Sequence, residues 1–208
     1  MIARESQPIV LATLTAAVVV HYVYDWSGAL PLWGAVLLLV ALFRNPSRSV
    51  PAVPLAVVSP VDGRVVDVQT TQDSYLDRDA VRISVLMSLS SVYYSRSPVE
   101  GKVMRLWLTP GEHLSLGNPR AASLNQRTAL WLHTDEGDDV VMVMLFGPFS
   151  RPRCQAHAGE RLGQGQRCGY IPFGGRVDVL LPEVTRVEVK TGDQVLAGSD
   201  IIARLVHK

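Results

Sequence analysis

The chain has 208 residues, enough for one domain with a full hydrophobic core and an accessory segment. Hydrophobic residues make up 48% of it and charged residues only 19%. Its formal net charge of +1 gives no basic footprint for nucleic acid. The two cysteines, Cys154 and Cys168, match no metal-ligand spacing, and we expect two free thiols rather than a disulfide.

Two apolar runs, residues 8–24 and 28–43, come first and are separated by Asp25-Trp26-Ser27. As helices, each would be roughly 25 Å long, slightly less than a bilayer core. Both runs are apolar on every face, which favours lipid over water as their surroundings. We therefore expect residues 1–43 to form a membrane-anchoring helical hairpin. The alternatives are two buried helices of a soluble core, or helices that lie in one leaflet.

Basic residues stand at both outer ends of this hairpin: Arg4 before it, and Arg44 and Arg48 after it. Because basic residues mark the cytoplasmic side of spanning segments, both ends are predicted to be cytoplasmic. We expect the inner membrane as the location, with the following domain on its cytoplasmic side. Residues 44–54 contain three prolines, which cannot continue a helix, and are interpreted as a linker.

From residue 55 to residue 208 the chain is β-rich. Valine-rich runs bounded by Gly, Pro or Asp are typical of short strands, and they occupy residues 64–68, 81–86, 102–108, 140–145, 176–180 and 186–189. A short helix is predicted around residues 121–127. The sequence Ser59-Pro-Val-Asp-Gly-Arg-Val recurs as Ser97-Pro-Val-Glu-Gly-Lys-Val. Such repeated Gly-acidic turns resemble barrel-sandwich hybrid domains, so we expect a mostly β, barrel-sandwich-hybrid-like fold.

Four motifs occur in an order that identifies a family. They are SPVDG at 59–63, SSVYYSRSPVEG at 90–101, LNQRT at 124–128 and GYIPFGGRVDVLLP at 169–182. Together with the apolar anchor they resemble the short, membrane-anchored phosphatidylserine decarboxylases. The family motifs are S-P-x-D-G, L-D-x-H-x-x-R-x-P-V-x-G, N-E-R and G-x-I-x-F-G-S-R-V-D.

The resemblance implies a specific chemistry. The family's serine in F-G-S attacks the preceding carbonyl, splits the chain and becomes a pyruvoyl group. That group forms a Schiff base with the lipid amine and accepts electrons while carbon dioxide leaves. A histidine acts as base and an aspartate orients it, as in a serine–histidine–aspartate triad.

This chain departs from the family at the reacting positions. Asp62 stands at the position of the orienting aspartate, but Tyr93 replaces the histidine and Gly175, after Gly174, replaces the serine. Gln126 replaces the acidic residue of N-E-R, and Ser91 replaces the aspartate of L-D-x-H. Glycine offers no nucleophile, and tyrosine, with a pKa of about 10, is a poor base near neutrality.

We therefore expect an unprocessed, catalytically impaired family member without a pyruvoyl cofactor, which binds lipid or a partner at the membrane. The alternative is an active pyruvoyl-dependent decarboxylase that is processed by an unrecognised route. Four other residues could supply a nucleophile: Ser150, Cys154, Cys168 and Ser199. Three histidines could serve as the base: His113, His133 and His157.

The resemblance also implies contacts with substrate. Arg96, Asn125 and Arg127 fall at family positions predicted to bind it, and guanidinium groups suit the lipid phosphate. Arg151 and Arg153 are expected to meet acidic headgroups of an anionic or phosphatidylserine-containing membrane. A second copy of the chain or an active homologue is a further possible partner. No metal site and no nucleic-acid partner are predicted.

Overall fold

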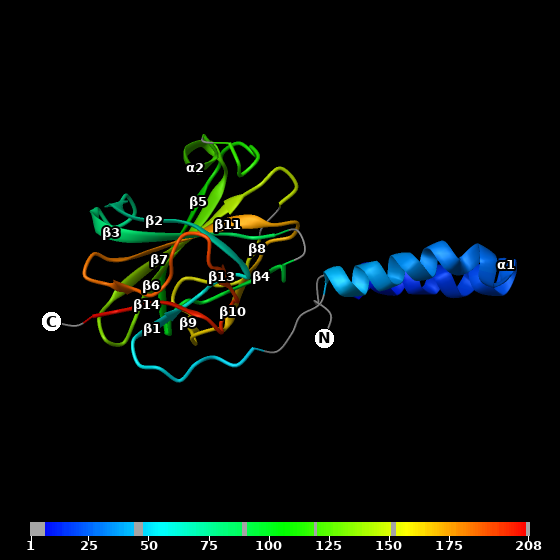
Figure 1. Ribbon diagram of the computed structural model, residues 1–208, viewed down its shortest axis with the longest axis horizontal. Coiled ribbons are helices and arrows are strands. Elements are labelled where there is room, and N and C mark those ends of the chain that lie inside the picture. Colours follow the sequence, from blue (N-terminus) through cyan, green and yellow to red (C-terminus); the bar gives the residue numbers. More distant parts are fainter. Residues whose placement is uncertain (1–6, 44–47, 89–90, 119, 151–152, 207–208) are drawn as a thin grey trace. The chain divides into compact units, whose positions relative to one another are not determined.

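The computed structural model places most of the chain in two compact units, Met1–Ser47 and Arg48–Lys208 (Figure 1). The described residues are 7–43, 48–88, 91–118, 120–150 and 153–206. Arg4, Arg44 and Arg151, on which orientation and headgroup contacts were predicted, lie outside them.

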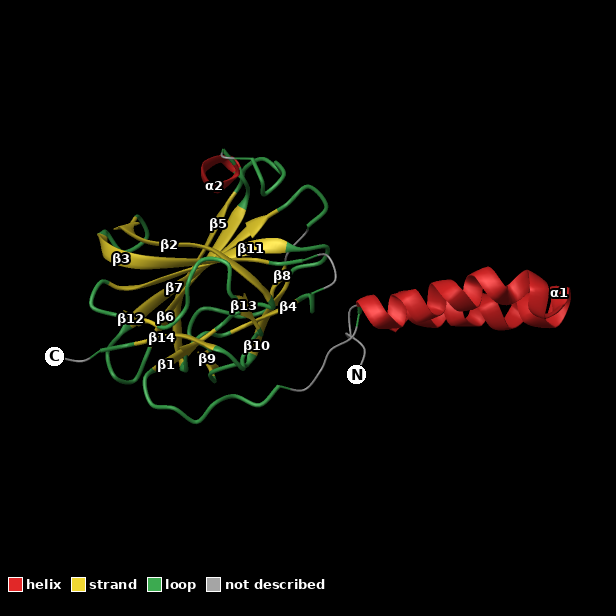
Figure 2. Ribbon diagram, viewed as in Figure 1, coloured by secondary structure: helices red, strands yellow, loops and turns green. Residues whose placement is uncertain are grey.

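The first unit consists of α1 (Gln7–Leu42), drawn as two coiled arms in Figure 2. Ala17 and Ala29 are fully buried, which the surface of a lone helix would not allow, so the arms pack on each other. The predicted apolar helical hairpin is confirmed. Gln7–Tyr24 is long and apolar enough to cross a membrane, and Trp26–Ala41 is shorter. Leu11 and Leu37 are 60% and 70% exposed, which suits lipid better than a soluble core.

The second unit is mostly β, as predicted. Its largest sheet has eight antiparallel strands and curls into a half-barrel. In spatial order these strands are β13 (Gln194–Val195), β2 (Gly63–Asp73), β3 (Arg78–Leu86), β11 (Gly175–Pro182), β7 (Asp139–Phe146), β6 (Arg127–His133), β5 (Gly101–Thr109) and β9 (Arg161–Leu162).

Two small sheets complete the domain. One contains β1 (Ala56–Val58), β14 (Ile201–Arg204) and β12 (Arg186–Val187), and the other contains β4 (Tyr94–Arg96), β10 (Arg167–Tyr170) and β8 (Arg153–Cys154). One apolar core joins all three sheets, because Val57, Cys168 and Val177 belong to the same buried cluster. Burial of such aliphatic side chains stabilises the fold by about 25 cal/mol per Å² of apolar surface.

The repeated turns occupy matching positions. Ser59 Oγ donates to the carbonyl of Val61 at 2.8 Å, and Ser97 Oγ donates to that of Val99 at 2.7 Å. The turns also bond reciprocally, since Val58 N donates to Pro98 O and Arg96 N donates to Pro60 O. The sequence repeat is therefore a structural repeat.

The predicted helix at residues 121–127 is shorter than expected. The structure has a single turn, α2 (Ala121–Leu124), and Arg127 already begins β6. Asn125 leaves the helical conformation at φ −68° and ψ 145°, and Gln126 N donates to Glu112 O. This tertiary bond explains the early end of the helix.

Candidate functional site

The position that the motifs predict for processing, Gly175, follows a sharp turn between β10 and β11. Phe173 and Gly174 both have positive φ, 60° and 84°. Left-handed geometry is common for glycine but rare for phenylalanine, so the turn holds local backbone strain. Gly175 follows as the first residue of β11, opposite Phe146 of β7. The chain thus has a strained strand-to-strand turn just before the predicted processing position.

Gly175 has no room for a side chain. A Cβ atom built on it would lie 2.7 Å from Ile171 Cγ2 and 3.2 Å from the carbonyl oxygen of Leu145. Ile171 is fully buried, and its γ2 methyl group is attached next to the backbone, so it cannot easily move away. A pyruvoyl group keeps the β-carbon of its parent serine as a methyl group. In its present conformation the turn leaves no space for that methyl group, and because Ile171 matches the isoleucine of the family motif, it is the turn that would have to shift to hold it.

Tyr93, at the position of the family's histidine, lies beside this turn. Its carbonyl accepts a 2.6 Å hydrogen bond from Ile171 N, and its ring centroid is 5.9 Å from that of Phe173 and 6.3 Å from that of Tyr170. Burial, with a smaller effect of Tyr170, raises the pKa of Tyr93 above its usual value. Its phenol therefore stays protonated near neutrality, so almost no phenolate is present to accept a proton.

Asp62 is bound on both carboxylate oxygens. Arg48 Nη2 donates to Oδ2 and Ala197 N donates to Oδ1, both at 2.7 Å. The Asp62 and Arg48 side chains are only 12% and 18% exposed. This carboxylate fastens the segment after the hairpin to the turn at Leu196–Gly198.

Arg96 is buried beside other cations. Its Nη1 donates to the carbonyl of Gly165 at 2.8 Å. Burial lowers the pKa of Arg96, and Arg167 and Arg48 lower it further, while Asp62 opposes them. Arg167 also stands over the ring of Tyr94, 4.9 Å from its centroid. Arg96 thus has two other cations and one carboxylate among its electrostatic neighbours, which leaves its surroundings electropositive.

Asn125 has a different environment from Arg96. Its amide donates to the carbonyls of Leu114 and Phe146, at 2.8 and 2.7 Å, and its Oδ1 accepts from Leu114 N. Both amide hydrogens are therefore used by the backbone. Asn125 ties the loop before α2 to the end of β7, and its predicted contact with substrate stays a prediction.

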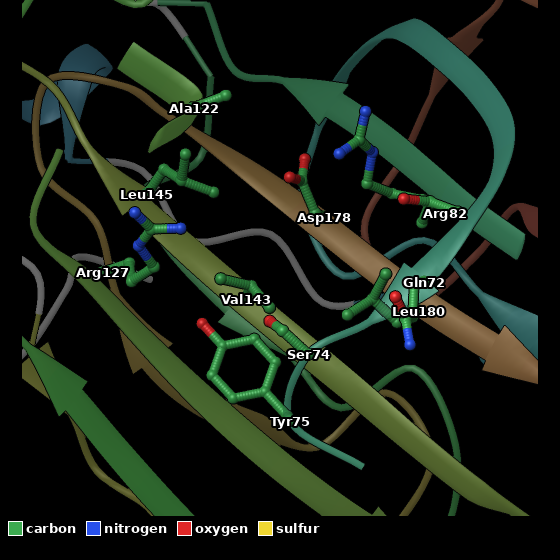
Figure 3. A pocket seen from close by; sticks show the side chains of 11 residues that line it. Gln72, Ser74, Tyr75, Arg82, Ala122, Arg127, Val143, Leu145, Asp178 and Leu180 are labelled. Carbon is green, nitrogen blue, oxygen red and sulfur yellow. The ribbon is translucent and has the colours of Figure 1, made fainter. Parts of the chain in front are cut away.

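Arg127 lies on another part of the domain. It lines a cavity of about 100 Å³ with Tyr75, Arg82 and Asp178, and its Nη2 donates to the carbonyl of Ser123 (Figure 3). Sequence reasoning grouped Arg127 with Arg96. The structure gives the two arginines different neighbours, and it adds Tyr75 and Arg82, which no motif indicated.

The residues that could take the place of the missing nucleophile or base are poorly suited to these roles. Cys168 is fully buried, and desolvation raises its pKa to about 12, so little thiolate forms at neutral pH. Burial also raises the pKa of the Cys154 thiol. His133 pairs with Asp139, at the opposite end of β6 and β7 from Gly175. Both cysteines are free, and the described residues contain no group of ligands that could hold a metal ion.

The fold and turn thus define a β-rich half-barrel domain that follows an apolar hairpin and carries a strained loop before its central strand. Residues 37–203 match the family model for phosphatidylserine decarboxylase. The chain is 43% identical to the phosphatidylserine decarboxylase proenzyme of Nitrosomonas europaea over 204 residues, 98% of this chain and 94% of that protein. It is 42% identical to the proenzyme of Burkholderia ambifaria over 206 residues, 99% and 96% of the two chains.

The proenzyme of Aromatoleum aromaticum is 41% identical over 206 residues, 99% of this chain and 96% of that one. This chain therefore belongs to the phosphatidylserine decarboxylase family of phospholipid metabolism.

Proposed function

We propose that this protein is an uncleaved, catalytically impaired member of its family that binds lipid at the cytoplasmic face of the inner membrane. The main support is Gly175, which has no nucleophile and whose missing side chain is replaced by the Ile171 methyl group, 2.7 Å from the ideal Cβ position. Without an oxygen or sulfur atom on residue 175, the backbone has no route to an ester intermediate and no ketone can form.

The second reacting position supports the same proposal. Tyr93 is only 3% exposed and packs against Tyr170 and Phe173. Its raised pKa removes the proton-accepting role of the family's histidine. In a catalytic unit, loss of one member already removes most of the rate. Here both the nucleophile and the base are replaced.

A role in lipid binding rests on what is kept. The hairpin α1 supports membrane anchoring by its length and composition. Arg167 and Arg48 act on Arg96 as like charges and Asp62 is the one carboxylate that acts on it, so the charge around Arg96 is positive and favours an anionic headgroup. The hairpin and the cationic cluster, which would bind lipid, are thus kept, whereas the reacting groups are replaced. A partner, either a second copy or an active homologue, would dock on the same scaffold.

The mass of the intact protein tests the absence of processing. We expect one species of 22.7 kDa from the purified full chain. The relatives are named proenzymes, which favours the alternative of an active decarboxylase with another processing route. That alternative predicts two pieces, a pyruvoyl-blocked N-terminus on the smaller one, and release of carbon dioxide from phosphatidylserine. Either product overturns our proposal.

Restoring the reacting groups tests their assignment. Gly175→Ser alone should remain uncleaved, because no base stands at residue 93. Adding Tyr93→His restores the base, and Ile171, which matches the isoleucine of the family motif, is kept. We expect slow self-cleavage only in the double variant. A folded double variant that stays intact would show that these positions are not the family's processing positions.

Headgroup binding is tested with a soluble, short-chain phosphatidylserine. Arg167→Gln, at an exposed position, should weaken binding about tenfold, the usual effect of losing a charge-assisted hydrogen bond. Arg186→Gln on β12 removes the same charge elsewhere and should change binding little. Equal affinity of both variants, at equal thermal stability, would contradict lipid binding by this cluster without affecting the absence of cleavage.

A further inference from the structure

A polar cavity lies on the outer face of the half-barrel sheet. Residues of β11 alternate between two faces: Val177 and Val179 belong to the main core, whereas Asp178 and Leu180 line the cavity. Gly175 has the same parity as the core residues, and its missing Cβ points at Ile171. The cavity is therefore separated from the processing turn by the thickness of the sheet.

The positive charges around the cavity are only partly balanced by carboxylates. Asp178 is neutralised by Arg176, whose Nε and Nη2 donate to its two oxygens at 2.7 and 3.2 Å. Arg82 donates one bond to Asp67 at 2.9 Å. Arg127 forms no ion pair with a carboxylate among the described residues. The guanidinium of Arg127 thus gives the cavity an uncompensated positive charge.

Two donors next to the cavity also lack acceptors. The Nε atoms of Arg82 and Arg127 are buried and have no hydrogen-bond partner among the described residues. A buried donor without a partner costs free energy, so such atoms usually face water or a ligand. Figure 3 shows the two arginines on either side of Asp178, with the Tyr75 hydroxyl pointing toward Arg127.

Tyr75 adds a neutral donor. Burial raises the pKa of its phenol, and the nearby Arg127 offsets part of that rise. The phenol is therefore protonated near neutrality and can donate to an anion. The cavity volume of about 100 Å³ has room for a tetrahedral oxyanion in place of several water molecules.

We propose that this outer cavity is a binding site for a phosphate-class oxyanion, held by Arg127 and Tyr75, with Arg82 adding a second positive charge. Nothing in this site depends on whether the chain is processed. A guanidinium and a phenol around a small, half-enclosed cavity match the charge and the hydrogen-bond acceptors of phosphate.

Calorimetric titration tests the proposal. The full chain is reconstituted in vesicles of phosphatidylcholine, which has no net charge, and titrated with inorganic phosphate. We expect saturable binding, which Arg127→Gln weakens about tenfold or more and Tyr75→Phe weakens less. Arg186→Gln, an equal loss of charge on β12, is the matched control and should bind as the unaltered chain does. Absence of saturable binding, or equal weakening by both arginine variants, would overturn the site.

A variant that is expected to strengthen phosphate binding provides a second test, which does not depend on the folding of Arg127→Gln. Asp67→Asn releases Arg82 from its carboxylate partner and should strengthen phosphate binding severalfold. If Arg127→Gln fails to fold, Asp67→Asn and Tyr75→Phe still decide the proposal. Unchanged affinity in both would mean that the cavity holds only water.

A second titration identifies the source of the oxyanion. Phosphatidylglycerol in the vesicles carries the same chemistry on a lipid. If a headgroup fills the site, phosphatidylglycerol should weaken inorganic phosphate binding to the unaltered chain, because the two compete. If the natural ligand is a soluble phosphate ester, glycerol phosphate should compete in its place. Competition by neither contradicts a site for phosphate-class oxyanions in general.

Discussion

The turns that begin at Ser59 and Ser97 share a sequence and a backbone geometry but differ in what their carboxylates do. Each serine bonds a carbonyl two residues later, and each serine carbonyl accepts from a glycine at φ +70°, Gly198 or Gly165. Asp62 of the first turn is 12% exposed at its side chain, whereas Glu100 of the second is 59% exposed.

This difference separates local structure from function. The shared serine, proline and glycine form the same turn twice because their bonds are local or reciprocal. The carboxylate is free to diverge, since it contacts whatever packs on it from outside. In the first copy that neighbour is Arg48, and in the second it is Arg161 at the surface. A repeated motif therefore predicts a turn more securely than it predicts a site.

The largest effect should come from the turn glycines and should be the same in both copies. A Cβ on Gly63 would lie 2.3 Å from the carbonyl oxygen of Leu86, and one on Gly101 would lie 2.6 Å from that of His133. Backbone atoms cannot yield cheaply, so Gly63→Ala and Gly101→Ala should each cost about 3 kcal/mol or more. Urea unfolding measures this. Gly117→Ala, with open space around it, is the control. A small loss in either copy would break the equivalence.

Removal of the carboxylate should destabilise the fold more in the first turn than in the second. Asp62→Ala leaves Arg48 and Ala197 N without their acceptor in a mostly buried place, and we expect a loss of about 2 kcal/mol. Glu100→Ala removes one partner of an exposed arginine and should change stability by less than about 0.5 kcal/mol. The free energies of unfolding of the two variants check this. Similar losses would show that exposure does not distinguish the copies.

The serines should again behave alike. Ser59→Ala and Ser97→Ala each remove a buried hydroxyl that donates one hydrogen bond, at 2.8 and 2.7 Å. Each should cost about 1 kcal/mol, the net value of an ordinary hydrogen bond. Unfolding curves with unchanged slopes would confirm the size. A loss in one copy alone would mean that the two turns are not equally formed.

The smallest predicted effect is on how the stability of the fold depends on pH. Two bonds from Arg161 hold the pKa of Asp135 below its usual 3.8. Since the folded pKa is lowered, the stabilisation is present above pH 3.8 and is lost as pH falls through the folded value. Asp135 is fully exposed, so salt should screen the effect. Melting temperatures of the unaltered chain and Asp135→Asn should converge below that range. Parallel curves at all pH values would contradict the pairing.

Much of the fold could be predicted from the sequence, because its signals are local. The valine-rich runs predicted parts of β2, β3, β5, β7, β11 and β12, and the apolar runs predicted the hairpin. The β6 strand lacks that valine signal and was not predicted. The helix prediction extended past Leu124 because the bond from Gln126 N to Glu112 O is tertiary. Local propensity contains no information on such a bond.

For the candidate site, motif order predicts Asp62, Tyr93 and Gly175, and their roles stay predictions. The structure shows a turn with positive φ at Phe173 and Gly174, just before Gly175. The methyl group of Ile171 against Gly175 and the ion pair of Asp62 with Arg48 are packing facts that no spacing reveals. The cavity around Arg127 requires β2, β3, β11 and α2 together, so it becomes visible only in three dimensions.

The contact at Ile171 also shows what a side chain at residue 175 would require of the turn. A serine there would place its Cβ 2.7 Å from the γ2 methyl group of Ile171, so the turn would have to shift to accept it. The family motif pairs an isoleucine and a serine at these two positions, so the shift does not require a change at residue 171. Glycine instead lets the start of β11 lie closer to Ile171 than any larger residue would.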